Sequence, residues 1–181
     1  DSWEGSDWLM KTLLILRHGK SSWDNPFLDD YDRPLKKRGK RASTRMGQEV
    51  SRLDLMPQLV LSSKAKRARN TARRWAAAAG YEGPIEKKRS LYFSGTKEHV
   101  KVLSRVEDRV DRVLLVGHNP DLEDLIYRLC GESVRMATAS LAVIDLSIER
   151  WCQVGDAPGV LRLHRHPRDL ESDPGGSTES P

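Results

Sequence analysis

The segment that most restricts the fold lies near the start of the chain, in Lys11–Ser22, which reads KTLLILRHGKSS. Its apolar run, Leu13–Leu16, ends abruptly at Arg17-His18-Gly19. Consecutive apolar residues followed by a basic residue and a glycine predict a buried strand that runs into a tight turn. Strands of this kind belong to covered parallel sheets, which bind ligands beyond the carboxyl ends of their strands.

The residues at this turn suit a phosphate site. Arginine offers a fork of N–H donors that matches phosphate oxygens, histidine can act as a nucleophile, and glycine lets the backbone approach a ligand closely. The first hypothesis is therefore a phosphate site with a reactive histidine, His18. Because an Arg-His-Gly tripeptide also occurs by chance, this hypothesis depends on the rest of the chain.

Composition limits the size and class of the protein. The chain has 181 residues, 38% hydrophobic and 31% charged, with a net charge of +5 and a pI of about 9.3. This length suits one domain, and the basic balance fits anionic ligands such as phosphate esters, phosphoproteins or nucleic acid. Two cysteines, Cys130 and Cys152, form no disulfide framework and no CxxC metal motif, so a reducing, cytoplasmic location is expected. No apolar run is long enough to span a membrane, and residues 1–10 do not resemble a signal peptide.

Hydrophobic periodicity predicts alternating strands and helices, followed by strands alone. Strands are expected at residues 12–17, 58–62, within 85–91 and at 112–117; helices are expected from residue 36, from 62–63 to 79, at 96–108 and after 118. A hairpin of 139–147 with 149–154 and a strand around 159–165 should follow. This order predicts an α/β sandwich with a mostly parallel sheet and an antiparallel edge.

Three strand-to-helix junctions carry the candidate site residues. They are Arg17-His18-Gly19, the segment 62–72 with Arg67, and the turn 117–120 with His118. Each follows a buried strand, so the junctions should meet at one edge of the sheet. In the last turn, Asn119 suits the N-cap of the next helix and Pro120 its first position.

This set of side chains has a chemical logic. A neutral imidazole can attack phosphorus while its other ring nitrogen is held by an acceptor, often a backbone carbonyl. Arg17, Arg67 and a protonated His118 would bind the equatorial phosphate oxygens as charge develops. No metal or other cofactor is expected, because these cationic groups take that role. The leaving group still needs a proton, so a carboxylic acid should stand nearby.

The segments LRHGKSSW, SSKAKRARNTA and VGHNP together resemble the histidine phosphatase superfamily, which is named for its RHG motif. The segment DYDRPLKKRG narrows the resemblance to the small SixA-type phosphohistidine phosphatases. The resemblance implies His18 as the nucleophile and a phosphate site of Arg17, Arg67 and His118. It also implies a Rossmann-like three-layer α/β/α fold without the helical lid of larger phosphoglycerate mutases. We therefore expect a flexible lead-in at 1–10, a histidine phosphatase domain at 11–166 and a disordered tail at 167–181.

The acid is the least determined part of the site. Asp24, in the loop after the nucleophile, is the favoured candidate, and Glu98 is the alternative. Asp29, Asp30 and Asp32 are interpreted as a solvated acidic loop, with an ion pair of Asp32 and Arg33 that holds the loop before the first helix as the alternative for Asp32. Further substrate contacts are expected from residues next to the motifs, namely Gly19, Lys20, Ser21 and Asn119. The remaining histidines, His99, His164 and His166, are expected at the surface or on an edge strand.

Three functions are compatible with this reading. The first is a metal-independent phosphatase that hydrolyses phosphohistidine in proteins through a phosphohistidine intermediate. The second is the same chemistry on a small phosphate ester, and the third is a phosphate or nucleic-acid binding module without turnover. The tryptophans do not alternate with the basic run as in a nucleic-acid stacking surface, so a phosphorylated protein or small phosphate compound is the expected partner, with no nucleic acid or membrane.

Overall fold

The computed structural model describes residues 10–156 and 158–170. The strands are β1 (Lys11–Arg17), β2 (Leu59–Ser63), β3 (Ile85–Lys88), β4 (Arg112–Gly117), β5 (Leu141–Leu146) and β6 (Gly159–Arg165). The α-helices are α1 (Lys37–Arg52), α2 (Lys66–Ala79), α3 (Thr96–Leu103) and α4 (Asp121–Cys130). Short 3₁₀ helices are η1 (Asp30–Asp32), η2 (Arg89–Leu91), η3 (Trp151–Gln153) and η4 (Pro167–Leu170).

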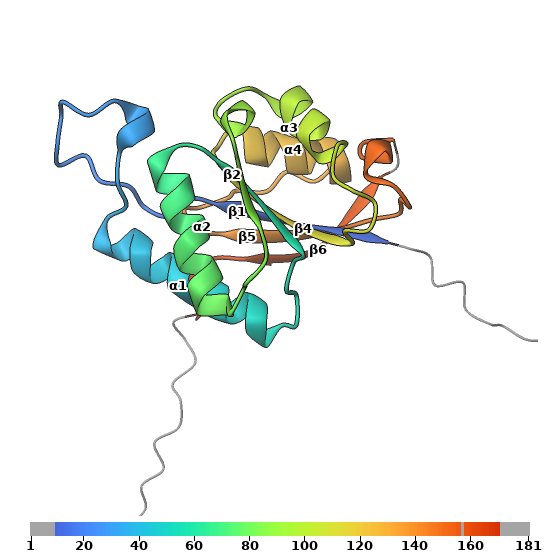
Figure 1. Cartoon of the computed structure of the whole chain (residues 1–181), viewed down its shortest axis with the longest axis horizontal. Helices are drawn as coiled ribbons and strands as arrows, with labels where there is room; N and C mark the ends of the chain where they lie inside the picture. Colours follow the sequence, from blue (N-terminus) through green and yellow to red (C-terminus); the bar gives the residue numbers. More distant parts are fainter. Residues whose placement is uncertain (1–9, 157, 171–181) are drawn as a thin grey trace, which may run out of the picture.

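All six strands form one sheet in the order β3-β2-β4-β1-β5-β6. β1 to β4 pair in parallel, whereas β5 runs antiparallel to both β1 and β6. Helices α1 and α2 cover one face of the sheet and α3 and α4 cover the other (Figure 1). The predicted three-layer α/β/α sandwich with a mostly parallel sheet is confirmed, and the described residues contain no helical lid over it.

The unbroken apolar run of β1 reflects burial on both faces of the sheet. Leu13 and Ile15 pack with the side chains of α3 and α4, and Leu14 and Leu16 pack with those of α1 and α2. All four side chains are fully buried. Burying a leucine or isoleucine is worth about 1.5–3 kcal/mol, so this strand holds both layers to the sheet.

The prediction of a hairpin between residues 139–147 and 149–154 was wrong. Residues Trp151–Gln153 form η3, and β5 pairs instead with β6. Trp151 is fully buried and its indole N–H donates to the Val110 carbonyl at 2.6 Å. The segment was misread because its apolar residues do not belong to a strand. They anchor a turn in the apolar core between the sheet and helices α3 and α4.

Two predicted boundaries also differ. The helix expected at 96–108 ends at Leu103, and residues beyond it form turns. Residues 167–170, expected to be part of a disordered tail, form η4, and Leu170 packs against the apolar cluster under α1 and α2. The rest of that tail, 171–181, and residues 1–9 of the expected lead-in lie outside the described residues.

Candidate active site

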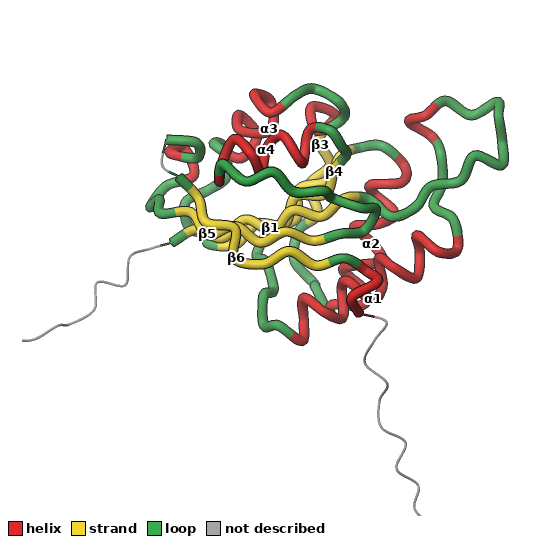
Figure 2. Tube along the Cα trace, turned by 180° about the vertical axis from the view of Figure 1, so that it is seen from behind, coloured by secondary structure: helices red, strands yellow, loops and turns green. Residues whose placement is uncertain are grey.

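The three junctions meet at the carboxyl edge of the parallel strands. In the parallel register, Arg17 of β1 stands opposite Gly117 of β4, and Val116 of β4 stands opposite Ser62 of β2. The strands therefore end level with one another, and the residues after each end are neighbours. The loop from β1 to α1 projects beside this edge, as the two opposite views show (Figures 1 and 2).

His18 is oriented by its own backbone. Its Nδ1 lies 2.7 Å from the Gly19 carbonyl oxygen, which can only accept, so Nδ1 carries the proton. Nε2 therefore keeps its lone pair, and Arg67 Nε–H donates to it at 3.3 Å. The ring is 7% exposed, so the nucleophilic nitrogen faces a nearly closed environment.

The surroundings keep His18 neutral. Burial lowers its pKa to about 3, and the nearby charges of Arg67, Arg17 and Arg33 act in the same direction, while the hydrogen bond to Gly19 opposes them. A neutral imidazole with an unprotonated Nε2 is the form that can attack phosphorus. The geometry thus provides the tautomer and the protonation state that nucleophilic catalysis requires.

Arg67 connects the nucleophile to the loop. Its side chain, 3% exposed, comes from the first turn of α2, directly after the β2 junction. Nε faces His18, while Nη1 donates to the Asp30 carbonyl oxygen at 2.5 Å and Nη2 to the Asp30 carboxylate at 2.8 Å. Asp30 therefore holds both terminal nitrogens of the guanidinium, and the Nε–H points at His18 Nε2.

Asp30 is a site residue that the sequence analysis interpreted as part of a solvated acidic loop. Its carboxylate also accepts hydrogen bonds from Tyr92 Oη at 2.7 Å and from Arg33 at 2.8 Å. Burial alone would raise the pKa of Asp30, but the hydrogen bonds from Tyr92, Arg67 and Arg33 outweigh it and lower the pKa to about 2. The signal for this role was the position of Asp30 three residues before Arg33, which allows the pair to close within one turn of η1.

His118 lies beside the nucleophile. The two ring centroids are 5.1 Å apart, and His118 Nε2 is hydrogen-bonded to Ser63 Oγ at 2.8 Å. The rings of Tyr92 and Phe93 pack against His118 at 5.3 and 5.0 Å. Its Nδ1 is buried and has no hydrogen-bond partner among the described residues.

The prediction that His118 is protonated does not hold for this ligand-free site. Burial lowers the pKa of His118 to about 2, helped by the proximity of His18 and the Arg67 charge. The sequence analysis counted a cation here but did not count the cost of burying one. A neutral His118 can still donate one hydrogen bond to a phosphate oxygen, but it contributes no charge before an anion is bound.

Arg17 and Asn119 are joined through the segment before β5. Arg17 Nη1 and Asn119 Nδ2 both donate to the Met136 carbonyl oxygen at 2.9 Å. Asn119 also donates to Glu123 at 2.8 Å, and it is not the helix cap that was predicted. Residue 120 occupies the N-cap and the helix begins at Asp121. Arg17 Nε and Asn119 Oδ1 are buried and have no hydrogen-bond partner among the described residues.

Three predicted substrate contacts have other partners. The Gly19 N–H donates to Thr71 Oγ1 at 2.9 Å, and its carbonyl orients His18. Ser21 is buried, and its hydroxyl accepts a hydrogen bond from Arg33. Lys20 is exposed, and its backbone carbonyl anchors the start of α1 through the Lys36 N–H at 2.8 Å. Gly19 and Ser21 thus support the site rather than point into it.

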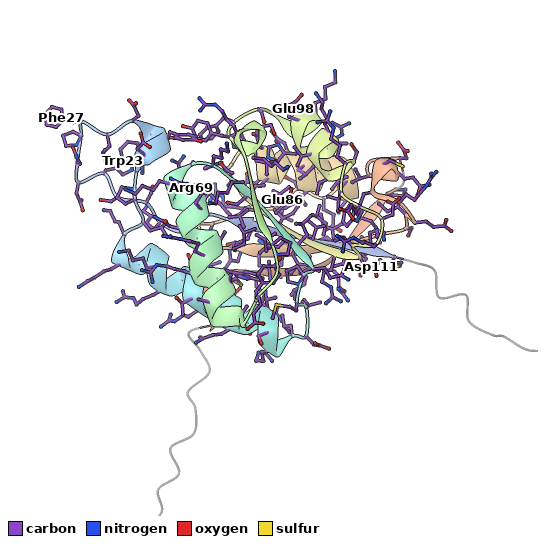
Figure 3. All side chains as sticks on the ribbon, viewed as in Figure 1. Trp23, Phe27, Arg69, Glu86, Glu98 and Asp111 are labelled. Carbon is purple, nitrogen blue, oxygen red and sulfur yellow. The ribbon has the colours of Figure 1, made fainter. Side chains whose placement is uncertain are left out.

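Neither predicted acid reaches the nucleophile. Asp24 is exposed, and within the described chain its carboxylate has no hydrogen bond or ion pair to a site residue. Glu98 points outward from α3, where it pairs with Lys101 at 3.8 Å (Figure 3). The carboxylate that does contact the site is Asp30, which its low pKa keeps ionised.

His99 was expected at the surface and is completely buried. It occupies the core side of α3 one turn before Leu103, and its Nδ1 is bonded to the Gly95 carbonyl at 2.8 Å. His164 lies on the edge strand β6, as predicted.

Other features of the described residues do not add to the site. They contain no group of three or more His, Cys, Asp or Glu side chains placed to hold a metal ion. None of their helices is both long and apolar enough to cross a membrane. A cavity of about 410 Å³ lies between β2, β3 and the end of α3, and none of His18, Arg67 and His118 lines it.

The same combination of residues is found in a known family. The model of the Histidine phosphatase superfamily (branch 1) matches residues 13–92, a range that contains both His18 and Arg67. This chain belongs to that superfamily. Its His118 lies outside the matched range, and the tertiary structure brings it to the same site.

Several known proteins resemble this chain over most of its length. An uncharacterised chloroplastic protein of Arabidopsis thaliana is 32% identical over 152 residues, which are 79% of this chain and 70% of that protein. An uncharacterised protein of Mycobacterium tuberculosis is 31% identical over 156 residues, covering 86% of this chain and 92% of that protein. The structure of a proposed phosphohistidine phosphatase, SixA, from Nakamurella multipartitia superposes with a TM-score of 0.77 at 27% identity, covering 87% and 96% of the two chains.

Proposed function

We propose that this histidine phosphatase hydrolyses phosphohistidine in proteins, through a phosphohistidine intermediate on His18 and without a metal ion. The observation that carries the proposal is the orientation of His18, with Nδ1 bonded to the Gly19 carbonyl and Nε2 facing Arg67. The likeness to the SixA structure supports the same substrate class. The cytoplasm, a reducing compartment in which Cys130 and Cys152 stay free, remains the predicted location.

The first half of the reaction transfers the phosphoryl group to the enzyme. Nε2 of His18 attacks phosphorus, a new P–N bond forms, and the P–N bond to the substrate imidazole breaks. Arg17, Arg67 and His118 would bind the phosphoryl oxygens as charge builds on them. When the other nitrogen of the substrate ring is protonated, the ring leaves as neutral imidazole and needs no further proton.

The second half returns the enzyme to its starting state. Water attacks the phosphoryl group, the P–Nε2 bond breaks, and inorganic phosphate leaves. Because Nδ1 of His18 already carries a proton that is shared with the Gly19 carbonyl, His18 also leaves as neutral imidazole. Both halves break a P–N bond in the same way, and neither uses a carboxylic acid.

The ionised state of Asp30 favours this substrate over an alkyl phosphate ester. An alkoxide leaving group needs a proton from a general acid, and an ionised Asp30 with a pKa of about 2 cannot supply one at neutral pH. A phosphorylated imidazole, or an activated aryl phosphate, is cleaved without that proton. The site therefore fits leaving groups that depart without acid assistance.

The test compares the wild type and His18→Ala on free N-phosphohistidine and on a generic aryl phosphate, with and without EDTA. We expect turnover by the wild type that EDTA does not reduce, no turnover by the variant, and an acid-labile phosphoenzyme after rapid quenching. Turnover that survives His18→Ala would refute the proposal. A wild type that hydrolyses neither substrate between pH 5 and 8 would leave only a binding function.

A further inference from the structure

The loop between β1 and η1 exposes three apolar side chains, which we call the loop patch: Trp23, Phe27 and Leu28. Their exposed fractions are 67%, 94% and 38%. Figure 3 shows Trp23 and Phe27 on the part of the loop that projects from the body of the molecule. Large apolar side chains grouped in this way on a surface usually mark a contact with another molecule.

The loop patch is connected to the catalytic residues through side-chain contacts. The Arg33 guanidinium lies over the Trp23 ring at 3.2 Å and donates to the Asp30 carboxylate at 2.8 Å. Asp30 in turn holds Arg67 beside His18. The base of the loop is closed by the Ser22 N–H, which donates to the Pro34 carbonyl at 2.8 Å. A molecule that covers Trp23 therefore contacts the loop that holds Arg33 and Asp30, and through them Arg67.

A second surface begins at the same end of the molecule. The exposed side chains of α1 and α2 form what we call the basic face: Lys37, Lys40, Arg41, Arg73 and Arg74. A furrow of about 400 Å³ runs between the two helices, and its lining side chains are basic, amide or alanine. Helix α2 contains no acidic residue, and the acidic residue of α1, Glu49, is buried against Arg52.

We propose that the loop patch and the basic face form one docking surface for the folded protein that carries the phosphohistidine, and that this partner presents acidic residues around the modified side chain. The proposal rests on the proposed function and specifies its substrate as a protein surface. Basic side chains steer an acidic partner to the site, and exposed aromatic side chains supply the desolvated anchor that holds it.

The charges within the loop favour a protein over a nucleic acid. Asp24 and Asp29 are exposed on either side of Phe27, where they would repel a phosphate backbone. One face of the Trp23 ring is covered by Arg33, so that face cannot stack on a base. A protein surface can pair its own basic residues with the loop aspartates and its acidic residues with the basic face.

The test uses two substrates that share the same bond. One is free N-phosphohistidine, and the other is a folded acidic protein phosphorylated on one surface histidine. The variants are Phe27→Ala and the double variant Lys40→Glu/Arg74→Glu, none of which touches the catalytic groups. Matched controls on the opposite helical layer are Tyr127→Ala, which removes a side chain that is 62% exposed, and Arg105→Glu, which reverses another exposed charge.

We expect each loop-patch or basic-face variant to lower kcat/KM on the phosphorylated protein by about tenfold or more, mainly through KM. The same variants should match the wild type on free phosphohistidine, and the controls should match it on both substrates. The charge-reversal effect should shrink as salt is added, because the interaction is electrostatic.

Distinct results separate the failure of this proposal from that of the proposed function. If the wild type hydrolyses both substrates and every variant keeps the wild-type rate on the phosphorylated protein, the docking surface is refuted while the phosphatase function stands. If the wild type hydrolyses neither, both fail. If an RNA oligonucleotide inhibits hydrolysis of the phosphorylated protein while an unphosphorylated acidic protein does not, the surface binds nucleic acid and the proposal is overturned.

Discussion

Arg67 donates hydrogen bonds to Asp30 from both of its terminal nitrogens, one to the carbonyl oxygen at 2.5 Å and one to the carboxylate at 2.8 Å. This leaves Nε as the nitrogen that faces His18. Arg67 is therefore positioned beside His18 by a loop residue 37 positions earlier in the chain. Two predictions follow from the two sides of this contact.

Arg67→Lys should lower kcat on an aryl phosphate by about 100-fold or more. Lysine keeps the charge but has no planar fork, so it cannot contact His18 and Asp30 at the same time. Steady-state kinetics measure the loss. Arg73→Lys, an exposed position of the same helix, is the control and should keep wild-type activity. Equal kinetics for the two variants would show that the charge alone matters.

Asp30→Asn should lower kcat by about tenfold with little change in KM, because it weakens charge-assisted hydrogen bonds that hold Arg67 in place. Since the pKa of Asp30 is about 2, the loss should be the same at pH 5 and pH 8. Asp24→Asn, in the same loop, should behave like the wild type. A larger or pH-dependent loss in Asp24→Asn would instead restore Asp24 as the general acid.

The tautomer and charge of His18 can be observed directly. We expect ¹⁵N NMR of the ligand-free protein to show a ring protonated at Nδ1 and unprotonated at Nε2, unchanged from pH 8 to pH 5. His118 should also remain neutral over this range, because burial lowers its pKa to about 2. In urea, both rings should titrate near the ordinary value of about 6.5. Protonation of either folded ring near pH 6.5 would contradict the assignment.

Burying neutral histidines should make stability depend on pH. In the unfolded chain a histidine binds a proton with a pKa of about 6.5, whereas His18 and His118 in the folded protein have pKa values lowered to about 3 and about 2. Between these values the unfolded state holds more protons, so stability is full above pH 6.5 and falls as the pH decreases. Between pH 7 and 5 each ring should reduce the free energy of unfolding by about 2 kcal/mol.

His118→Gln isolates one of these contributions. Urea denaturation at pH 7 and pH 5 should show that the variant loses about 2 kcal/mol less stability than the wild type over this interval. The absolute stability of the variant does not affect this comparison, since only the difference between the two pH values is used. An identical loss in both proteins would mean that His118 is not buried in its neutral form.

Gly19→Ala should destabilise the fold as well as the site. A Cβ at this position would lie 2.6 Å from the Gly39 carbonyl oxygen and 2.9 Å from Ser43 Oγ, so α1 must move away from the end of β1. Overpacking of this kind costs about 1–3 kcal/mol. Gly117→Ala is the control, because its nearest neighbour is a leucine methyl at 3.3 Å that can shift. Urea denaturation of both variants measures the difference.

Local patterns sufficed for the layers of the fold and for the grouping of the three junctions. Leu13–Leu16 and Val113–Val116 are unbroken apolar runs, which is the pattern of parallel strands buried on both faces. Because parallel strands end at one edge, residues that follow two such strands must be neighbours. The proximity of His18, Arg67 and His118 was therefore predictable, whereas the neutral state of His118 was not, since it depends on how deeply the ring is buried.

The loop residues and the last third of the chain were harder to interpret. Asp30 is one of several aspartates in a loop without periodicity, and nothing local distinguishes the one that faces Arg67. His99 and Trp151 were misplaced for a related reason, because both are buried with a polar ring nitrogen. Trp151 Nε1 bonds to the distant Val110 carbonyl, and His99 Nε2 has no partner among the described residues.

By itself, the amino-acid sequence determined which residues follow the buried strands, and that the three junctions carry two arginines and two histidines. Only the tertiary structure decided which carboxylate holds Arg67, which ring nitrogen of His18 is unprotonated, and that burial keeps His18 and His118 neutral. These properties depend on desolvation and on contacts between distant segments, and a linear pattern contains neither quantity.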